Sequence, residues 1–423
     1  MAVRLKVART ARELDDVFKL RYEVYVRERG KFSPADEEVG DRIIDQFDAI
    51  PNSINIIAYN EENNQAIACM RINKDSEIGL PAEKHFDFSL ARQELELERD
   101  HFPSETVRIG EKKTTLVSGS MLAIRQEWRN RRNVIFALFK TVAGVMHSMG
   151  ATHVIGAISA ETSSLYGRMG FSMLGKPRWI ESVGDELTPM LAPFDKVLQW
   201  AYGDMSEGNI PFWLINYSFR FERLLLSAGE VLFYEDDNGK DAYAIDDGWI
   251  AISRKTYDRE SGKSQEIVLA NLPRPSLLGE LALFDDEPRA ATATAITNAE
   301  LIVIGRRQLY AILRDNPDKM KDIICHFTRR VRETDDMVIQ AHAPHAVRVD
   351  FTLNKLWQAA PMDRKDPRVR IARVGPAQIA LSAHVLENDV INILEKYRED
   401  GVLDYGRKSI RFFQMPSAEW PEE

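Results

Sequence analysis

The hydrophobic pattern of this chain changes along its length, and the changes limit what it can fold into. Residues 1–203 alternate strand-like runs such as INIIAYN and THVIGAIS with helix-like stretches, which is typical of an α/β domain. From about residue 220 to 307, short strands alternate with turn residues, which predicts a β-barrel or sandwich. The last 75 residues return to helical patterns. We therefore expect several domains, each with its own core.

The polar, glycine-containing stretch YGDMSEGNIPF is typical of a linker between the first two domains. We expect the following organisation: an α/β domain at 1–203, a linker at 204–219, a β domain with a long helix at 220–345, a helical domain at 346–416 and a tail at 417–423.

Composition narrows the classes of partner. With 44% hydrophobic and 29% charged residues the chain is typical of globular protein, and its net charge of -9 gives no general attraction to nucleic acid or anionic membrane. Two distant cysteines, Cys69 and Cys325, support neither a disulfide framework nor a metal cluster, and we expect both to be buried thiols. With no signal-like or membrane-spanning apolar run apparent, a cytoplasmic location is expected.

The stretch GELALFDDEPRAA, 279–291, places one arginine among small residues and one glutamate nine positions before it. The start of a short helix after Gly279 offers free backbone amides to an anion, and Arg289 adds a forked cation. Glu280 accepts hydrogen bonds and so suits hydroxyls. A nucleotide with a phosphate beside a free ribose hydroxyl has both features.

This stretch resembles the phosphate-binding cassette of the cyclic nucleotide-binding domains, and the likeness covers about 220–345. The resemblance implies that Glu280 binds the ribose 2′-hydroxyl, that Arg289 binds the cyclic phosphate, and that amides near Gly279, Leu281 and Ala290 complete the site. Alanine, not the threonine of cyclic GMP binders, follows the arginine, which favours cyclic AMP. A cassette that folds without a ligand is the alternative.

The helix expected at 316–342 has an apolar stripe with alternating spacings of four and three, which predicts a homodimer seam. By resemblance to the catabolite activator proteins, Arg330 and Thr334 fall where base-contacting residues lie, although a solvated Thr334 explains the sequence equally well.

The carboxyl-terminal segment resembles the winged helix of the same regulators, with a candidate recognition helix at 387–398. That helix opens with Glu387, Asn388 and Asp389, and two carboxylates there would repel DNA phosphates. We expect a packing module that does not read DNA, and keep DNA binding as the alternative.

Residues 116–175 resemble the GCN5-related N-acyltransferases, an α/β (α+β) fold that carries SLYGRMGF as its most specific motif. The resemblance implies that Tyr166 protonates the leaving thiolate and that the strand backbone at Leu122 and Ile124 holds a pantetheine arm. A core tyrosine is the alternative for Tyr166. The expected glycines of the following loop are replaced by Arg132 and Val134. The cluster Arg129, Arg131 and Arg132 favours acyl carrier protein over coenzyme A as donor. A solvated basic turn explains the cluster as well.

The amino-terminal part resembles the acyl-homoserine-lactone synthases and the long-chain N-acyl amino acid synthases. The matching positions include Arg21, Asp45, Asp48 and Arg71, for which substrate binding and a buried structural role are both open. The E-x-S-R segment of the lactone synthases is missing at 118–121, so a product with an acylated amine is expected.

Together these patterns predict a bacterial, cyclic AMP-regulated N-acyltransferase that transfers a long acyl chain from acyl carrier protein, or from coenzyme A, to a small-molecule amine. A cyclic AMP-dependent protein-lysine acetyltransferase is one alternative. A DNA-binding regulator with an inactive acyltransferase domain is the other.

Overall fold

The computed structural model describes residues 2–32, 40–95, 114–202, 222–258, 263–274, 276–284, 287–315, 343–360, 362–363, 366 and 368–416, together with the pairs 320–321, 324–325, 327–328 and 331–332. These residues form two compact units, one of 1–254 with 272–309 and one of 255–271 with 310–423. None of their helices is long and apolar enough to cross a membrane.

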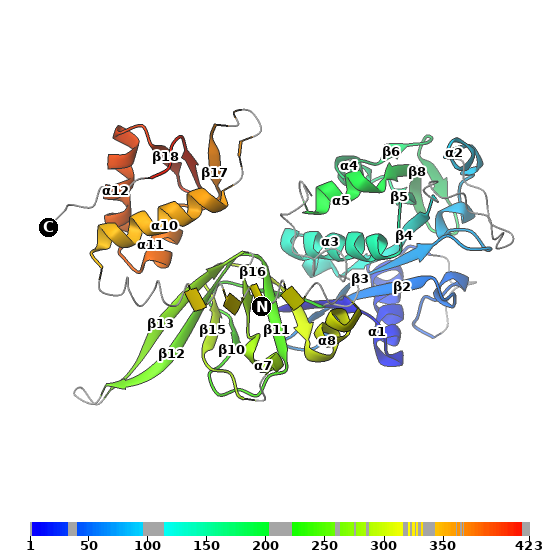
Figure 1. The fold of residues 1–423 in the computed structure, drawn as a ribbon. Coiled ribbons are helices and arrows are strands. Elements are labelled where there is room, and N and C mark those ends of the chain that lie inside the picture. Colours follow the sequence, from blue (N-terminus) through cyan, green and yellow to red (C-terminus); the bar gives the residue numbers. More distant parts are fainter. Residues whose placement is uncertain are drawn as a thin grey trace. The chain divides into compact units, whose positions relative to one another are not determined.

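The amino-terminal part of the first unit is an α/β layer structure (Figure 1). Its strands are β1 Val3–Val7, β2 Ser53–Asn60, β3 Gln65–Lys74, β4 Leu116–Ile124, β5 His153–Ser159, β6 Ser172–Met173, β7 Arg178–Ile180 and β8 Asp185–Pro193. Its α-helices are α1 Ala11–Tyr22, α2 Ser89–Glu94, α3 Arg132–Ser148, α4 Ser163–Arg168 and α5 Phe194–Tyr202. Helix α1 starts at a capping box, in which Thr10 and Glu13 each satisfy the other's backbone N–H.

Helices cover both faces of this sheet. Because side chains alternate along a strand, Ala68, Met70 and Ile72 of β3 join the core beneath α3 and α5, whereas Cys69 joins the core beneath α1. The predicted burial of Cys69 is confirmed.

A β-rich part follows; most of it lies in the first unit, whereas residues 255–271 and 310–315 belong to the second. Its strands are β9 Glu222–Leu226, β10 Val231–Phe233, β11 Asp241–Asp247, β12 Trp249–Asp258, β13 Lys263–Pro273, β14 Leu277–Leu278, β15 Thr292–Ala295 and β16 Ala299–Gly305, with helices α7 Leu281–Phe284 and α8 Arg306–Asp315. One four-stranded sheet has the order β10-β15-β12-β13.

The other strands of this part continue the amino-terminal sheet, because β9 pairs antiparallel with β1. The combined sheet has the order β14-β11-β16-β9-β1-β2-β3-β4-β5-β8-β6, with β7 paired to β8. The two regions that the sequence separates into domains therefore share one backbone ladder.

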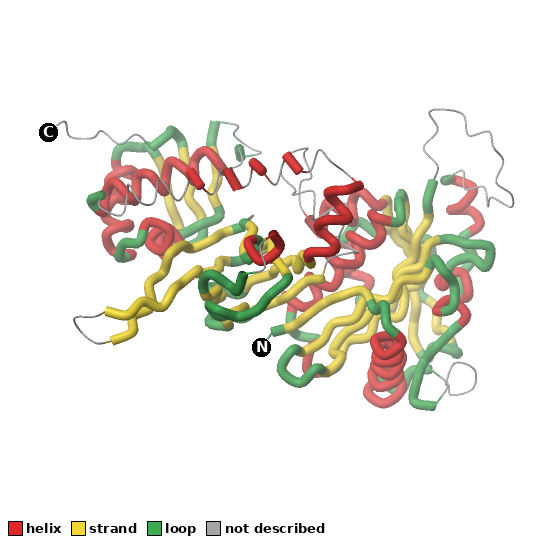
Figure 2. Tube along the Cα trace, turned by 60° about the horizontal axis from the view of Figure 1, so that its bottom comes forward, coloured by secondary structure: helices red, strands yellow, loops and turns green. Residues whose placement is uncertain are grey.

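The carboxyl-terminal elements are α10 His345–Ala359, β17 Arg370–Ala372, α11 Pro376–Ala383, α12 Glu387–Glu399, β18 Leu403–Gly406 and β19 Ser409–Phe412. The three strands form a sheet of order β17-β19-β18, and the helices pack around a core that includes Leu353, Leu394 and Phe412. Figure 2 distinguishes these helices from the strands by colour.

Candidate functional site

Strand β4 contains a bulge. Cys69 pairs with Ala123 and Arg71 pairs with Ser120, so that Met121 and Leu122 together oppose the single residue Met70. Met121 has a φ of 53°, which is uncommon for a residue with a side chain. Bulges of this kind interrupt pairing and bend a strand, and they are frequent beside active sites.

Beyond the bulge, β4 and β5 part from each other. The two parallel strands pair only through Leu116 with His153, Val117 with Val154 and Ser118 with Ile155, although both continue for several residues. Backbone groups of 119–124 that point toward β5 therefore have no strand partner there. An opening between parallel strands is a place where a ligand's amide can add to the sheet.

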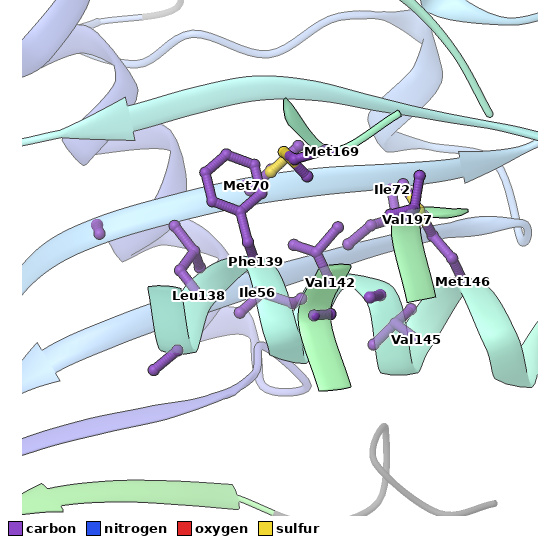
Figure 3. Packing of buried hydrophobic residues seen from close by; sticks show 14 of the residues in the cluster. Ile56, Met70, Ile72, Leu138, Phe139, Val142, Val145, Met146, Met169 and Val197 are labelled. Atoms are coloured by element: carbon purple, nitrogen blue, oxygen red, sulfur yellow. The ribbon is translucent and has the colours of Figure 1, made fainter. Parts of the chain in front are cut away.

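A narrow apolar cavity of about 20 Å³ adjoins this opening. Phe139, Val142 and Met146 of α3 form part of its wall, and Figure 3 shows them on the side of α3 that faces Met70 of β3. Its other lining residues come mainly from β4, β5 and the segment after β5, and are Gly119, Val154, Ile155, Gly156, Ile158, Tyr166, Met169, Phe171 and Val197. The cavity suits an alkyl chain.

Tyr166 of α4 lies in the wall of this cavity and is 9% exposed. Its ring meets Phe139 and Phe171 edge-on, with centroids 5.7 and 5.3 Å apart. Burial raises the pKa of the Tyr166 hydroxyl above its ordinary value of 10, so the group stays protonated at neutral pH. It therefore has the protonation state that a proton donor to a thiolate needs.

The predicted donor-binding residues lie around the end of β4. The Leu122 carbonyl accepts a hydrogen bond of 2.8 Å from the Tyr25 hydroxyl, and the Ile124 carbonyl accepts one of 2.9 Å from Arg129 Nε. Arg129 also forms an ion pair with Glu28. Both carbonyls and this arginine are thus engaged within the chain.

The other two arginines of the basic loop are exposed at the start of α3. Arg131 stacks on Trp128, with its guanidinium carbon 4.4 Å from the ring centroid, and Arg132 is the first residue of the helix. Free amides and two cations at one helix terminus favour binding of an anion.

The residues Arg21, Asp45, Asp48 and Arg71 form a buried ion network on the α1 face of the sheet. Arg71 binds both carboxylate oxygens of Asp45 and lies 2.9 Å from Asp48, which in turn accepts a hydrogen bond of 2.8 Å from Arg21. Arg21 and Arg71 are 0% exposed. Because side chains alternate along β3, Arg71 points away from the cavity that Met70 lines, which supports the structural role over direct contact with the acyl chain.

Two further polar residues could act as a base, but neither is among the residues that line the cavity. His153 begins β5 at the paired end of the opening, and burial lowers the pKa of its imidazole. Glu161 is exposed and lies 3.6 Å from Arg29. Neither is positioned by a contact to the cavity.

The cassette residues come together at the start of β11. Arg289 is 5% exposed, donates to the Gly279 carbonyl at 2.9 Å and to the Asp241 carbonyl at 2.7 Å, and stacks on Phe233. Among the residues that the structure describes, none accepts a hydrogen bond from its Nε. A guanidinium with an unpaired buried donor is prepared for an additional anionic partner.

Glycines make room for this arginine. Gly279 has a φ of 68°, and a Cβ there would lie 2.7 Å from Arg289 Nη1; a Cβ at Gly239 would clash with the same guanidinium. Glu280 is 2% exposed, whereas Leu281 and Ala290 are exposed at the rim. These residues fit a bound cyclic phosphate. Arg330 and Thr334 lie outside the described residues.

The predicted dimer seam, 316–342, is described only in part. Met320, Ile324 and Val331 are 44%, 56% and 62% exposed in the single chain. Cys325 is exposed in the single chain, so its expected burial is wrong.

Helix α12 coincides with the predicted recognition helix. Glu387 and Asn388 are exposed in its first turn, whereas Asp389 is half-buried and accepts a hydrogen bond from His345 at 3.0 Å if the ring carries the proton. Arg407 and Lys408, between β18 and β19, are also exposed. The acidic start of the helix remains the dominant local charge.

Two family models match the chain. Residues 16–193 match the model described as N-acyl amino acid synthase FeeM, and residues 223–316 match the cyclic nucleotide-binding domain. The first match spans the opening, the cavity and the ion network. The second spans the cassette and the strands around it.

Individual proteins are similar over parts of the chain. The cyclic AMP receptor protein of Thermus thermophilus is 27% identical over 187 residues, which are 44% of this chain and 81% of that protein. The CRP-like cAMP-activated global transcriptional regulator of Mycobacterium tuberculosis is 29% identical over 26% of this chain and 46% of its own length. The solved structure of FeeM, an N-acyl amino acid synthase from uncultured soil microbes, is 13% identical over 47% of this chain and 94% of that one, with a TM-score of 0.36.

Proposed function

We propose, from the union of an N-acyl amino acid synthase FeeM domain and a cyclic nucleotide-binding domain in one chain, that this protein is an N-acyltransferase regulated by cyclic AMP. The substrates are a long-chain acyl thioester, carried by acyl carrier protein, and a small-molecule amine. The observation that carries the proposal is the opening between β4 and β5 beside an apolar cavity that contains Tyr166.

The chemistry is direct transfer. The amine nitrogen attacks the thioester carbon, the C–N bond forms and the C–S bond breaks, and the sulfur leaves as a thiolate that takes the proton of Tyr166. The tyrosinate then regains a proton from water, which balances the proton that the amine releases. The amine loses its proton to water or to a basic group, since a free amine is mostly protonated at pH 7. The chain's main contribution is to hold the two reactants together in a site that excludes water.

The donor is held by three features of this chain. Unpaired backbone of β4 faces the pantetheine arm, the cavity takes the alkyl chain, and Arg131 with Arg132 at the start of α3 attracts a phosphate and an acidic carrier surface. Arg129 adds to this positive surface only if its ion pair with Glu28 opens.

The test is a comparison of donors. The protein is incubated with a long-chain acyl carrier protein and a panel of amino acids and amines, and products are identified by mass spectrometry. We expect an N-acylated product and release of the free carrier thiol. Turnover of acetyl-CoA with a lysine peptide, and none with the long-chain donor, would instead identify a protein-lysine acetyltransferase.

The ligand of the cassette is tested separately. Arg289→Ala and Glu280→Ala should each weaken calorimetric binding of cyclic AMP by at least roughly ten-fold, since each leaves a polar ligand group unpaired. Ala290 after the arginine and the named activity of the two curated relatives support cyclic AMP over cyclic GMP. Wild-type affinity in both variants would refute the cassette assignment.

A different class of function is kept for the carboxyl-terminal module. A winged helix that binds DNA would give a salt-dependent, sequence-selective shift of promoter fragments. We expect none, because the exposed Glu387 and the half-buried Asp389 place carboxylates where base-contacting residues would lie.

A further inference from the structure

Four charged side chains from four elements meet in one buried cluster, here called the Lys140 cluster. Lys140 of α3 donates to Asp246 of β11 and to Glu300 of β16, both at 3.0 Å. Arg223 of β9 donates to Asp246 at 2.8 Å and also to Glu300. The four side chains are between 1% and 10% exposed. One member comes from the region matched to the acyltransferase and three from the β-rich part.

Stability alone is a weak reason for such a cluster. Two cations and two carboxylates lose their hydration on burial, and apolar side chains of similar volume often serve a fold equally well. Burial raises the pKa of Glu300. Burial would also raise the pKa of Asp246, but the nearby cations of Arg223 and Lys140 outweigh it and lower that pKa. Buried charges of this kind specify one arrangement of the elements that carry them, because any other arrangement leaves a charge unpaired.

One end of the cluster leads to the cassette along β11. The cassette arginine, Arg289, donates to the carbonyl of Asp241, the first residue of this strand, and Asp246 is the sixth. A strand rises about 3.3 Å per residue, so a span of roughly 17 Å of continuous backbone joins the two contacts. A phosphate bound by Arg289 would compete with the Asp241 carbonyl for the guanidinium.

The other end leads to the cavity along α3. Lys140 follows Phe139, whose ring lines the cavity and meets Tyr166 edge-on at 5.7 Å. The Lys140 carbonyl also accepts a hydrogen bond of 2.7 Å from Tyr202 at the end of α5. A small rotation of α3 about this anchor would move Phe139 against Tyr166.

We propose that Lys140 is a positioning residue, and that the Lys140 cluster transmits occupancy of the cassette to the Phe139 and Tyr166 side of the acyl cavity. This inference rests on the proposed function and adds its regulatory route. Binding of cyclic AMP changes the hydrogen bonding of Arg289 to the Asp241 carbonyl and thereby favours one position of β11. Because Asp246 of β11 is paired with Lys140 of α3, the helix moves with the strand. The nucleotide and the acyl donor are then coupled, each changing the affinity for the other by the same factor.

The experiment follows α3 directly by hydrogen-exchange mass spectrometry of the full chain, with and without cyclic AMP. The variant Lys140→Met with Glu300→Gln removes one charge of each sign and leaves Arg223 paired with Asp246. Lys6→Met with Glu13→Gln is the matched control, because Lys6 and Glu13 form a 2.8 Å pair in the same region but outside the cluster. Calorimetry reports cyclic AMP binding for each protein.

In the wild type and the control, cyclic AMP should change exchange across 132–148 by at least roughly five-fold, the lower end of ordinary allosteric couplings. The cluster variant should bind cyclic AMP and leave exchange of α3 unchanged. A wild-type response of α3 in the cluster variant would overturn the inference, as would binding without any response in the wild type. Absence of cyclic AMP binding in the wild type would refute the regulatory part of the proposed function instead.

Discussion

Replacing Arg71 by methionine tests whether the buried ion network holds the fold. Arg71 supplies both side-chain hydrogen bonds that reach the two carboxylate oxygens of Asp45, and it approaches Asp48 at 2.9 Å. Without it, Asp48 keeps Arg21, but Asp45, 4% exposed, keeps no cation among the described residues, and its remaining partners are backbone N–H groups such as that of Phe47 at 2.8 Å. An uncompensated buried charge costs about 3 to 5 kcal/mol.

That cost should appear locally, since the chain has several domains and a single unfolding free energy is poorly defined. Hydrogen exchange of β3 amides reports the free energy of opening around this network. A loss of about 3 kcal/mol corresponds to exchange faster by roughly 100-fold. The double variant Arg71→Met with Asp45→Asn removes the orphaned charge and should recover much of the protection.

The control is Arg42→Met. Arg42 pairs with Asp15, but the two side chains are 33% and 35% exposed, so this substitution should change exchange of β3 by less than about five-fold. Exchange of β3 in Arg71→Met within roughly three-fold of the wild type would contradict the structural role and return the network to substrate binding.

Three further outcomes are expected. Tyr166→Phe should lower kcat by at least roughly 10-fold with KM little changed, because the ring packing survives and the proton donor is lost; an unchanged kcat in steady-state assays would make Tyr166 a core residue. Burial would raise the pKa of Glu13, but Lys6 and two backbone N–H groups lower it to about 2. The ionised carboxylate therefore stabilises the fold above about pH 4.5, and this contribution is lost as pH falls toward 2. The thermal unfolding temperatures of Glu13→Gln and the wild type should converge over that window, and a constant difference would refute this. Gly239→Ala should weaken cyclic AMP binding by at least roughly ten-fold in calorimetry, because the added Cβ displaces Arg289, and equal affinity would show that the arginine can shift without loss.

Local features of the fold and site could be predicted from the sequence. Strand and helix patterns predicted the elements of both regions. The spacing of Gly279, Glu280 and Arg289 predicted a cassette, and in the structure the buried arginine of this cassette has a donor without a partner among the described residues. For Arg21 the sequence left substrate binding and a buried structural role open, and the structure pairs it with Asp48.

Features that depend on distant pairing could not be predicted. The bulge at Met121 requires the register of β4 against β3, and nothing in a methionine signals a positive φ. The Lys140 cluster joins residues 106 and 160 positions apart, and each of its members resembles an ordinary surface charge in the sequence. The pairing of β9 with β1 has no sequence signal either, since any apolar strand edge can accept another.

The β9–β1 ladder and the Lys140 cluster both connect the acyltransferase region to the β-rich part, but they differ in what they can do. The ladder of β9 on β1 covers an edge on each strand, and opening it would expose unpaired N–H and C=O groups on both, so it holds the regions together at all times. The Lys140 cluster is made of side chains, which can exchange partners while their backbones shift by a fraction of a residue. Because Asp246 accepts from both Lys140 and Arg223, a shift of β11 can weaken one bond as it strengthens the other. Regulation by a ligand requires two arrangements of the protein that are close in free energy. A carboxylate shared between two cations can provide two such arrangements, whereas a backbone ladder cannot.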